Sequence, residues 1–370
     1  MRTLIASPFL GEHLVLRPDD PRAVKVGAHR YRDLLAAATR PDNVVPAWLA
    51  DAARQRWDLD LAGRRLTDTV LVREPSALGY GRASYELNLG CNYDCEHCYL
   101  GVKRFEGMSW RARELVLRLM RDAGVLWLQL TGGEPTIDPL FSEVYRLAWD
   151  LGMVITLLSN GSRLHHPAIL ELLTSRRPYR ITVSVYGATE QSYDGLTRRK
   201  GSFRLFSRGL EAACAAGLPV TLSLVITRHN EHEIDAMRTL ADRYRLPFNE
   251  YSNISPTIHS GAETLPSQSA AFLRARKPFM GCGAGHTHFH VDPHGKASMC
   301  KVGRDSAVDL VTEGLDGLLR LGEIADGLMA RTGGCSGCAL SSTCFTCRPL
   351  ARLYQESGAP LNRYCQHTGR

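Results

Sequence analysis

Three cysteines lie close together in the eight-residue stretch CNYDCEHC. Cys91, Cys95 and Cys98 follow the spacing C-x₃-C-x₂-C, and Tyr99 comes directly after them. Three thiolates in one loop can hold three corners of a tetrahedral metal site or of an iron–sulfur cube. A structural zinc site needs a fourth ligand, and His97 lies too close to its cysteine neighbours to bind with them without strain. A cube held by three cysteines instead leaves one iron atom open to a small chelating ligand.

The composition is that of a globular protein of a reducing compartment. The chain has 370 residues, of which 44% are hydrophobic, and contains no uninterrupted apolar run long enough to span a membrane. Its start lacks the apolar core and cleavage site of a signal peptide, so we predict a cytoplasmic location. There the 11 cysteines are expected to bind metals rather than form disulfides. The net charge of +7 includes no basic block interleaved with aromatic residues, so no nucleic-acid partner is expected.

Alternating apolar runs and amphipathic stretches predict the elements that position the first cysteines. The expected strands cover residues 84–90, 125–131, 153–159, 180–185, 219–226 and 248–254. The expected helices cover residues 109–124, 140–152, 165–176, 202–217 and 232–244. Near-continuously apolar strands that alternate with helices indicate a parallel sheet buried on both faces. We therefore predict an α/β fold, a partial (β/α)₆ TIM barrel.

Parallel α/β sheets carry functional residues at the carboxyl ends of their strands. The cysteine stretch follows the first predicted strand, TGGEP (131–135) ends the second, and SNGS (159–162) ends the third. We therefore expect these three segments to meet at one edge of the sheet.

The distribution of cysteines divides the chain into four parts. No cysteine precedes Cys91, and seven follow residue 280. Residues 1–83 are predicted to form a hairpin followed by helices. This part is either a winged-helix-like peptide-docking module or an extension that packs on the barrel. Residues 84–254 are the barrel, residues 255–280 a linker, and residues 281–370 a turn-rich domain held together by metal.

The C-terminal cysteines form a second group: Cys282, Cys300, Cys335, Cys338, Cys344, Cys347 and Cys365. The stretch CSGCALSSTCFTC alone would suit a zinc ribbon, but seven cysteines do not divide into zinc tetrads. The sequence DPHG before Cys300 predicts a hairpin turn. Cys214 lies among alanines on a predicted helix and is expected to be a buried structural thiol.

The C-x₃-C-x₂-C loop at the end of a first barrel strand, followed by an aromatic residue, resembles the radical S-adenosylmethionine (SAM) enzymes. In that family the three cysteines, here Cys91, Cys95 and Cys98, hold a [4Fe–4S] cluster whose open iron binds SAM. The GGEP sequence one strand later strengthens the resemblance. Its glycines would let backbone carbonyls approach the SAM ammonium, and Glu134 would supply an anionic partner.

The resemblance implies further SAM contacts at positions that match the family's segments. These are Tyr99, Gly132, Gly133, Glu134, Ser159, Asn160, Ser184 and Arg199. Arg198 is an alternative to Arg199, because TRRKGSF carries two adjacent arginines. A solvated basic face is the other interpretation of this pair.

The C-terminal cysteines resemble the SPASM extension of radical SAM enzymes, which holds two auxiliary [4Fe–4S] clusters. Carried over, this pattern assigns the outer cluster to Cys335, Cys338, Cys344 and Cys365, and the inner cluster to Cys282, Cys300 and Cys347. The inner cluster then lacks a fourth ligand, and His288 stands where some relatives have a cysteine. We expect an open iron there, with ligation by His288 as the alternative.

The resemblance implies three [4Fe–4S] clusters and SAM, cleaved reductively to a 5′-deoxyadenosyl radical that modifies a ribosomally made peptide. A thioether or carbon–carbon crosslink, an oxidation or an epimerisation would fit. Flavodoxin or ferredoxin would supply electrons. Lys301 replaces the aspartate expected of formylglycine-forming relatives. Such a protein maturase, and a small-molecule alcohol dehydrogenase, are alternatives, as is a non-catalytic zinc or iron–sulfur scaffold. Lys301 and the histidines near Cys282 are candidate bases.

Overall fold

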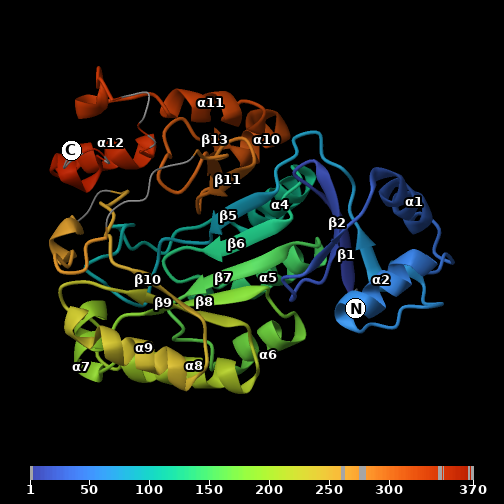
Figure 1. Cartoon of the computed structure of the whole chain (residues 1–370), viewed down its shortest axis with the longest axis horizontal. Helices are drawn as coiled ribbons and strands as arrows, with labels where there is room; N and C mark the ends of the chain where they lie inside the picture. Colours follow the sequence, from blue (N-terminus) through green and yellow to red (C-terminus); the bar gives the residue numbers. More distant parts are fainter. Residues whose placement is uncertain are drawn as a thin grey trace.

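The computed structural model comprises three parts that follow one another along the chain (Figure 1). It describes residues 3–259, 263–274, 281–340, 344, 346–365 and 367. The predicted linker 255–280 therefore includes two segments, 260–262 and 275–280, that lie outside the described residues. Where the chain is described, none of its helices has the length and apolar character needed to cross a lipid bilayer.

The N-terminal part is a small sheet with helices on one side. Its elements are β1 (Leu4–Phe9), β2 (Glu12–Leu16), β3 (Ala23–Lys25), α1 (Ala28–Ala38), α2 (Ala47–Trp57), α3 (Leu66–Thr69) and β4 (Val70–Val72). The strand order is β3-β2-β1-β4, in which β4 runs parallel to β1 and the other pairs are antiparallel. The hairpin and the helices predicted for residues 1–83 are present, but strands β1 and β4 were not predicted. We call this part the N-terminal module.

The two faces of this sheet bury different partners, because successive side chains of a strand point to opposite sides. Leu4 and Val15 pack against the helices, in a core that includes Leu49. Ile5 and Leu14 face the other way and pack against residues at the start of the barrel strands. The module therefore has a core of its own and is also attached to the barrel.

The central part contains six parallel strands in consecutive order, as predicted for a partial barrel. The strands are β5 (Arg82–Glu86), β6 (Trp127–Thr131), β7 (Val154–Ser159), β8 (Arg180–Val185), β9 (Val220–Val225) and β10 (Phe248–Tyr251). The helices are α4 (Trp110–Asp122), α5 (Phe141–Asp150), α6 (Pro167–Ser175), α7 (Glu190–Thr197), α8 (Ser202–Ala215) and α9 (Ile234–Arg243), with 3₁₀ turns η1 (Pro135–Ile137) and η2 (Glu231–Glu233). Helix α7 was not predicted; Thr189 caps it by accepting a hydrogen bond from the Ser192 amide.

One face of this sheet is apolar and the other is largely polar. The side chains of Leu128, Leu157 and Val183 are fully buried in the core that the helices cover. On the opposite face of the same strands lie Gln129, Thr156 and other polar residues that line cavities. The predicted burial on both faces therefore holds only in part, and the polar face is where the sheet can bind ligands.

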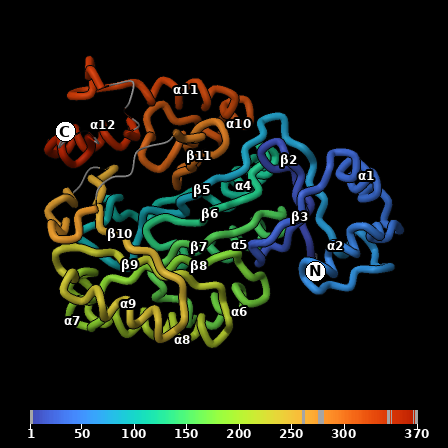
Figure 2. Tube along the Cα trace, in the orientation of Figure 1, coloured from blue at the N-terminus to red at the C-terminus, as the bar shows by residue number. Residues whose placement is uncertain are grey.

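The C-terminal part continues the central sheet instead of forming a separate one. Strand β11 (His288–Val291) pairs in parallel with β5, and β12 (Lys296–Ser298) and β13 (Val308–Asp309) follow at the edge. Figure 2 shows β11 beside β5 although they are far apart along the chain. The remaining elements are η3 (Leu265–Ser267), α10 (Leu310–Leu318), α11 (Leu321–Leu328), η4 (Gly333–Cys335), α12 (Arg348–Glu356) and η6 (Leu361–Arg363).

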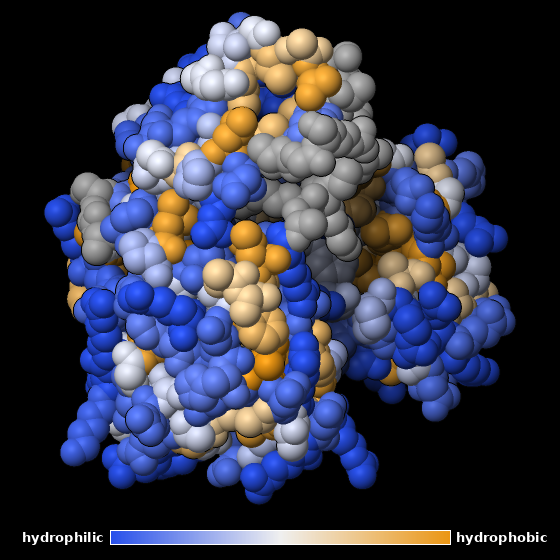
Figure 3. Space-filling model, turned by 60° about the vertical axis from the view of Figure 1, so that its left-hand side comes forward, coloured by the Kyte–Doolittle hydropathy of each residue, from blue (hydrophilic) through white to orange (hydrophobic). Residues whose placement is uncertain are grey.

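The hairpin predicted before Cys300 is confirmed, because β11 and β12 are antiparallel and joined at Asp292–Gly295. Just beyond it, the main apolar core continues with Val308, Leu310, Leu318 and Leu321. Other buried apolar residues form smaller clusters, one with Met299 and Ala325 and one with Tyr354 and Tyr364. Figure 3 shows one face of the whole molecule, on which hydrophobic residues lie in patches among hydrophilic ones.

Candidate functional site

A cavity of about 440 Å³ lies at the carboxyl ends of the barrel strands. The three cysteines of the first cluster, Cys91, Cys95 and Cys98, all line it, as does Tyr99. The loops after β6 and β7 contribute to the same wall. The structure therefore brings together the three segments that the sequence predicted at one edge of the sheet.

The cysteine loop is a compact turn that points its thiols inward. The Tyr93 amide lies 3.4 Å from the Cys91 sulfur, and the Cys98 amide donates to the Cys95 carbonyl at 3.2 Å. Burial, and then the charge of Glu134, raises the pKa of the Cys91 thiol to about 12, and burial raises the pKa of Cys95 well above its usual value. Such thiols become thiolates only beside a compensating cation, which is the environment that a metal centre supplies.

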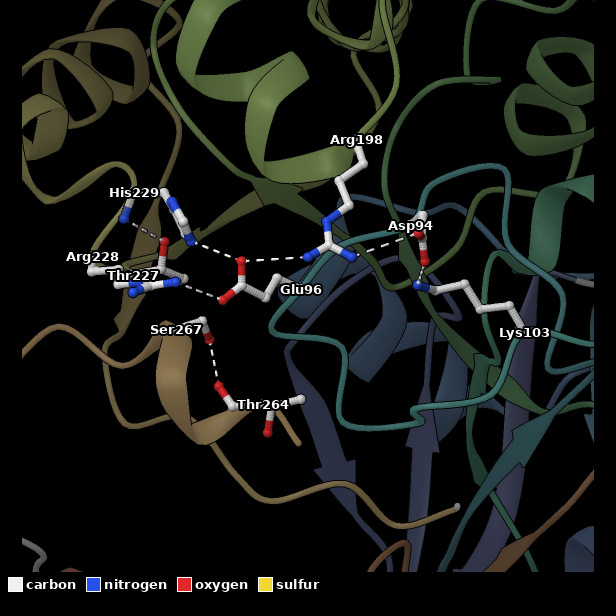
Figure 4. A network of polar contacts seen from close by, with 9 residues as sticks. All are labelled: Asp94, Glu96, Lys103, Arg198, Thr227, Arg228, His229, Thr264 and Ser267. Carbon is white, nitrogen blue, oxygen red and sulfur yellow. Dashed lines mark hydrogen bonds and ion pairs between the residues drawn. The ribbon is translucent and has the colours of Figure 1, made fainter. Parts of the chain in front are cut away.

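Ion pairs on the outer side of the cysteine loop tie it to neighbouring elements (Figure 4). The Glu96 carboxylate lies 3.1 Å from Arg228 and 2.9 Å from His229, both just after β9, and 3.5 Å from Arg198. Asp94 contacts Lys103 at 2.5 Å. The loop is therefore held from outside, while its sulfur atoms remain on the cavity side.

The two glycines of the GGEP sequence are required by close backbone packing. A Cβ atom on Gly133 would lie 2.1 Å from the Gly90 carbonyl oxygen, and one on Gly132 would lie 2.5 Å from the Asn88 oxygen. The Gly132 φ of 145° also suits glycine best. The Gly133 amide donates to Asn88 and the Glu134 amide to Gly90, each at 2.9 Å. Both glycines line the cavity, so the turn lies between the cysteine loop and the space inside.

The Glu134 side chain does not face the cavity that its neighbours line. Its carboxylate is fully buried and accepts from the Thr136 hydroxyl at 2.5 Å, the Ser159 hydroxyl at 2.9 Å and the Asn160 amide at 2.6 Å. Burial raises its pKa. Its predicted pairing with the SAM ammonium stays a prediction. In this structure Glu134 fixes the end of β7 to the turn after β6.

The residues predicted to contact SAM from β7 and β8 do reach the cavity. Ser159, Asn160 and Ser184 all line it. The Asn160 side-chain amide donates to the Asn92 side chain at 2.8 Å and lies 3.9 Å from the Cys91 sulfur. Asn160 therefore orients the cysteine loop and remains at the cavity surface.

The adjacent arginines contact the cysteine loop and are not among the residues lining the cavity. Arg199 donates to the Asn92 carbonyl at 2.7 Å, and Arg198 lies near Asp94 and Glu96. Arg198 adopts a left-handed backbone conformation at the end of α7. Both arginines therefore contact the loop that bears the cysteines, and the contact with SAM predicted for Arg199 or Arg198 stays a prediction.

Lys301, a candidate base that follows Cys300 in the sequence, also lines the cavity. Burial lowers its pKa to about 8. Its segment is anchored by Arg304, which donates to the Lys301 carbonyl at 2.7 Å and to both oxygens of Glu86 at 2.8 and 2.9 Å. His290 Nε2 lies 3.4 Å from the same carboxylate. This network was not predicted, because nothing in the local sequence of β5 indicates a partner 218 residues away.

The tail brings several predicted ligands of the outer cluster together. The pKa of the Cys335 thiol is raised, mainly by burial. The nearby Cys344 and Cys365 also raise this pKa, while Arg348 lowers it. The Cys344 thiol accepts from Arg348 at 3.4 Å. Although burial raises the pKa of Cys344, contacts with Thr346 and Arg348 lower it to about 6.

The predicted inner ligands lie on segments that meet. Cys300 packs against the cluster that contains Ala284, two residues after Cys282. A Cβ atom on Gly303 would lie 3.3 Å from Pro349, two residues after Cys347. In contrast, His288 lines a cavity at the other end of the strands, where no cysteine is present.

No three His, Cys, Asp or Glu side chains converge as ligands of a single metal ion, as far as the described residues reach. In an iron–sulfur cube each cysteine binds a different iron atom, so the ligands surround a cavity instead. Cys91, Cys95 and Cys98 have that arrangement. All eleven cysteines are free of disulfides.

Residues 85–241 match the Radical SAM superfamily. The chain is 33% identical over 164 residues to the mycofactocin maturase of Mycobacterium ulcerans, a match that covers 44% of each protein. It is 31% identical over 163 residues to the PqqA peptide cyclase of Ruegeria pomeroyi, which covers 42% of each. The chain thus spans less than half the length of these relatives.

The fold extends beyond the matched region. The structure of Streptococcus suis SuiB bound to its precursor peptide SuiA superposes with a TM-score of 0.60 at 12% identity, covering 99% of this chain and 98% of that one. The fold likeness therefore includes the N-terminal module and the C-terminal part as well as the barrel.

Proposed function

We propose that this protein is a radical SAM peptide maturase, since residues 85–241 match the Radical SAM superfamily. The observation that carries the proposal is the single cavity lined by Cys91, Cys95, Cys98, Gly132 and Gly133 at the carboxyl ends of the strands. A peptide substrate is supported by the relatives, since one is a PqqA peptide cyclase and SuiB binds the precursor peptide SuiA. When bound, a [4Fe–4S] cluster and SAM supply a 5′-deoxyadenosyl radical for hydrogen abstraction from the substrate.

The chain's own residues hold and shield these groups. The three cysteines bind the cluster, while the glycine turn leaves room for SAM beside it. Ser159, Asn160 and Ser184 offer polar atoms to SAM from the neighbouring strand ends. Tyr99 and Tyr186 line the same cavity with aromatic rings, which exclude water from a site where a radical would be quenched.

We infer two auxiliary [4Fe–4S] clusters in a SPASM domain of residues 281–370. The outer cluster takes Cys335, Cys338, Cys344 and Cys365; Cys344 and Cys365 lie near enough to Cys335 to raise the pKa of its thiol. The inner cluster takes Cys282, Cys300 and Cys347. Because the His288 side chain lines a cavity without cysteines, we favour an open iron at the inner cluster over ligation by His288. Lys301 lies next to Cys300 and lines the SAM cavity, so it can exchange a proton with a substrate placed there.

The N-terminal module is suited to dock a precursor peptide. Strand β3 is an edge strand, and its outer side is unpaired in the described sheet. Its residues are partly or fully exposed. An extended peptide can add to such an edge through main-chain hydrogen bonds. Electrons would come from a flavodoxin or a ferredoxin.

The decisive experiment is anaerobic reconstitution followed by two measurements. Three cubes predict about twelve iron atoms per chain, and incubation with SAM and a reductant should yield 5′-deoxyadenosine. Cys95→Ala should abolish this product. Cys214→Ala is the matched control, because Cys214 lies on α8 away from the cavity. Zinc without iron, or full product from Cys95→Ala, would contradict the proposal.

Co-expression with a small open reading frame beside the gene tests the substrate. Loss of two hydrogen atoms from the encoded peptide would indicate a crosslink or an oxidation, and unchanged mass with inverted stereochemistry would indicate epimerisation. A peptide unmodified by the SAM-cleaving enzyme would contradict that precursor assignment.

A further inference from the structure

A second cavity lies at the opposite, amino-terminal ends of the barrel strands. Its volume is about 590 Å³, and no cysteine lines it. The strands β5, β6, β7, β8 and β11 all contribute side chains. It therefore opens on the polar face of the sheet, at the end remote from the cysteine loop.

The inner wall of this cavity is a row of polar side chains across four strands. Ser84 is paired with Gln129, Gln129 with Thr156, and Thr156 with Arg180, so the four side chains lie side by side. All four line the cavity. The interiors of parallel barrels are usually filled by valine, isoleucine and leucine, which leave no space. Polar residues in place of these side chains forgo apolar packing, as expected where a polar ligand must bind.

Two arginines give the cavity a positive charge. Arg82 and Arg180 both line it and are exposed. Neither has a carboxylate partner within the described part of the chain. Each guanidinium is held over an aromatic ring, with Arg82 5.8 Å from the centre of Phe9 and Arg180 5.3 Å from that of Tyr179. The two cations are thus positioned in advance without being neutralised.

The two carboxylates that directly precede Pro21 in the sequence are already paired. Asp20 forms an ion pair with Arg22 at 2.7 Å, and Asp19 forms one with Arg17 at 3.3 Å. Neither aspartate lines the cavity. The positive charge of Arg82 is therefore available to pair with an anionic ligand.

The N-terminal module lies beside the cavity, at the starts of the barrel strands (Figure 1). Pro21 lines the cavity and comes two residues before β3 begins. A peptide added to the edge of β3 would have one end close to Pro21, and so close to the arginines. The cavity is placed to receive the next part of a peptide docked on the module.

We propose that this cavity binds an acidic segment of the peptide substrate. Asp or Glu carboxylates of the segment would pair with Arg82 and with Arg180, which can each donate two parallel hydrogen bonds, and Gln129 and Thr156 would bind the peptide backbone. The origin of the peptide rests on the proposed function. The binding chemistry does not, because it involves no residue of the SAM cavity.

The test measures binding by fluorescence anisotropy with the full-length, cluster-loaded protein. The probe is a fluorescein-labelled peptide of alternating glycine and glutamate, compared with one in which glutamine replaces glutamate. The glutamate peptide should bind, and the glutamine peptide should bind at least about tenfold more weakly. Equal binding of the two peptides would overturn the proposal.

Variants locate the site. Arg82→Ala and Arg180→Ala should each raise the Kd for the glutamate peptide at least about tenfold. Gln129→Glu, which adds a negative charge to the wall between the arginines at nearly unchanged shape, should do the same. The matched control is Arg146→Ala, because Arg146 is exposed on α5 and lines neither cavity. An effect of Arg146→Ala as large as those of the cavity variants would contradict the assignment.

Competition and catalysis separate the remaining possibilities. If inorganic phosphate displaces the glutamate peptide at equal concentration, the cavity is a general anion site and the peptide proposal is wrong. Arg82→Ala and Arg180→Ala should still convert SAM to 5′-deoxyadenosine without peptide. A protein that binds the peptide but never cleaves SAM would refute the proposed function and leave this binding site intact.

Discussion

The N-terminal module and the cysteine-bearing tail are held together by different means. The module buries fourteen apolar residues in one core. The tail after residue 333 contributes three buried apolar residues to its own cluster, Ala351, Tyr354 and Tyr364, among the residues described there. It carries five cysteines instead: Cys335, Cys338, Cys344, Cys347 and Cys365. A segment without an adequate core needs metal or another cross-link to be stable. Loss of iron is therefore expected to unfold the tail and to leave the module folded.

The largest expected effect is removal of the outer cluster. Cys335→Ser with Cys365→Ser should abolish the slow hydrogen exchange of α12, because binding of a structural metal contributes of order 10 kcal/mol to folding. The module, which has no cysteine, should exchange as in the wild type. Hydrogen–deuterium exchange with mass spectrometry measures both regions at once. Unchanged protection of α12 would show that the tail folds without metal.

The second effect concerns the buried ion pair that fastens the C-terminal part to the barrel. Glu86→Gln leaves Arg304 without its carboxylate in a site where Glu86 is fully buried, and should reduce the free energy of unfolding by about 3–5 kcal/mol. Denaturant unfolding measures it. Glu114→Gln, which breaks an exposed ion pair with Arg118, is the control and should cost less than about 1 kcal/mol.

This effect should also depend on pH. Although burial raises the pKa of Glu86, His290 and Arg304 lower it far below the usual range. A lowered folded-state pKa contributes stability above the unfolded-state pKa of about 4.3 and loses it as the pH falls toward the folded-state value. The difference between wild type and Glu86→Gln should therefore be largest near neutral pH. A difference that grows on acidification would contradict the assigned charge.

The third effect tests the module's core. Leu49 is fully buried, and Leu49→Ala should lower the free energy of unfolding by about 2–5 kcal/mol without changing the iron content. Val44 is 53% exposed in the same module, so Val44→Ala should change it by less than about 0.5 kcal/mol. Equal effects of the two variants, or iron loss in Leu49→Ala, would contradict the view that apolar packing stabilises the module independently of the metal-bound tail.

The smallest effect is expected at the surface network around the cysteine loop. Glu96→Gln removes the charge that faces Arg198, Arg228 and His229, but these groups are partly exposed and screened by solvent. Unfolding should change by less than about 1 kcal/mol. Iron content, measured in parallel, should equal that of wild type. Loss of iron would mean that the network, not the thiols alone, holds the loop.

Local patterns were sufficient to predict most of the central elements. The six strands follow from alternating apolar runs and helices, and β8 has the predicted bounds of 180–185. The Cys91, Cys95 and Cys98 loop and the GGEP turn follow from spacing within a few residues. Helix α7 was missed because its short, polar sequence lacks a long amphipathic pattern.

Contacts between distant segments could not be predicted in the same way. Glu134 is predicted at the site by its motif, but its partners Ser159 and Asn160 come from the next strand and turn it away from the cavity. Arg198 and Arg199 contact the cysteine loop for a similar reason: where a side chain at a helix end reaches depends on which loop packs beside it.

By itself the sequence determined the parallel strand–helix order, the cysteine spacing and the glycines at the turn, because each depends on residues close together in the chain. Only the tertiary structure decided that β11 joins β5, that Glu86 pairs with Arg304, and that Arg82 and Arg180 line one cavity. These features depend on the register of strands that are far apart in sequence, and that register is set by packing over the whole sheet.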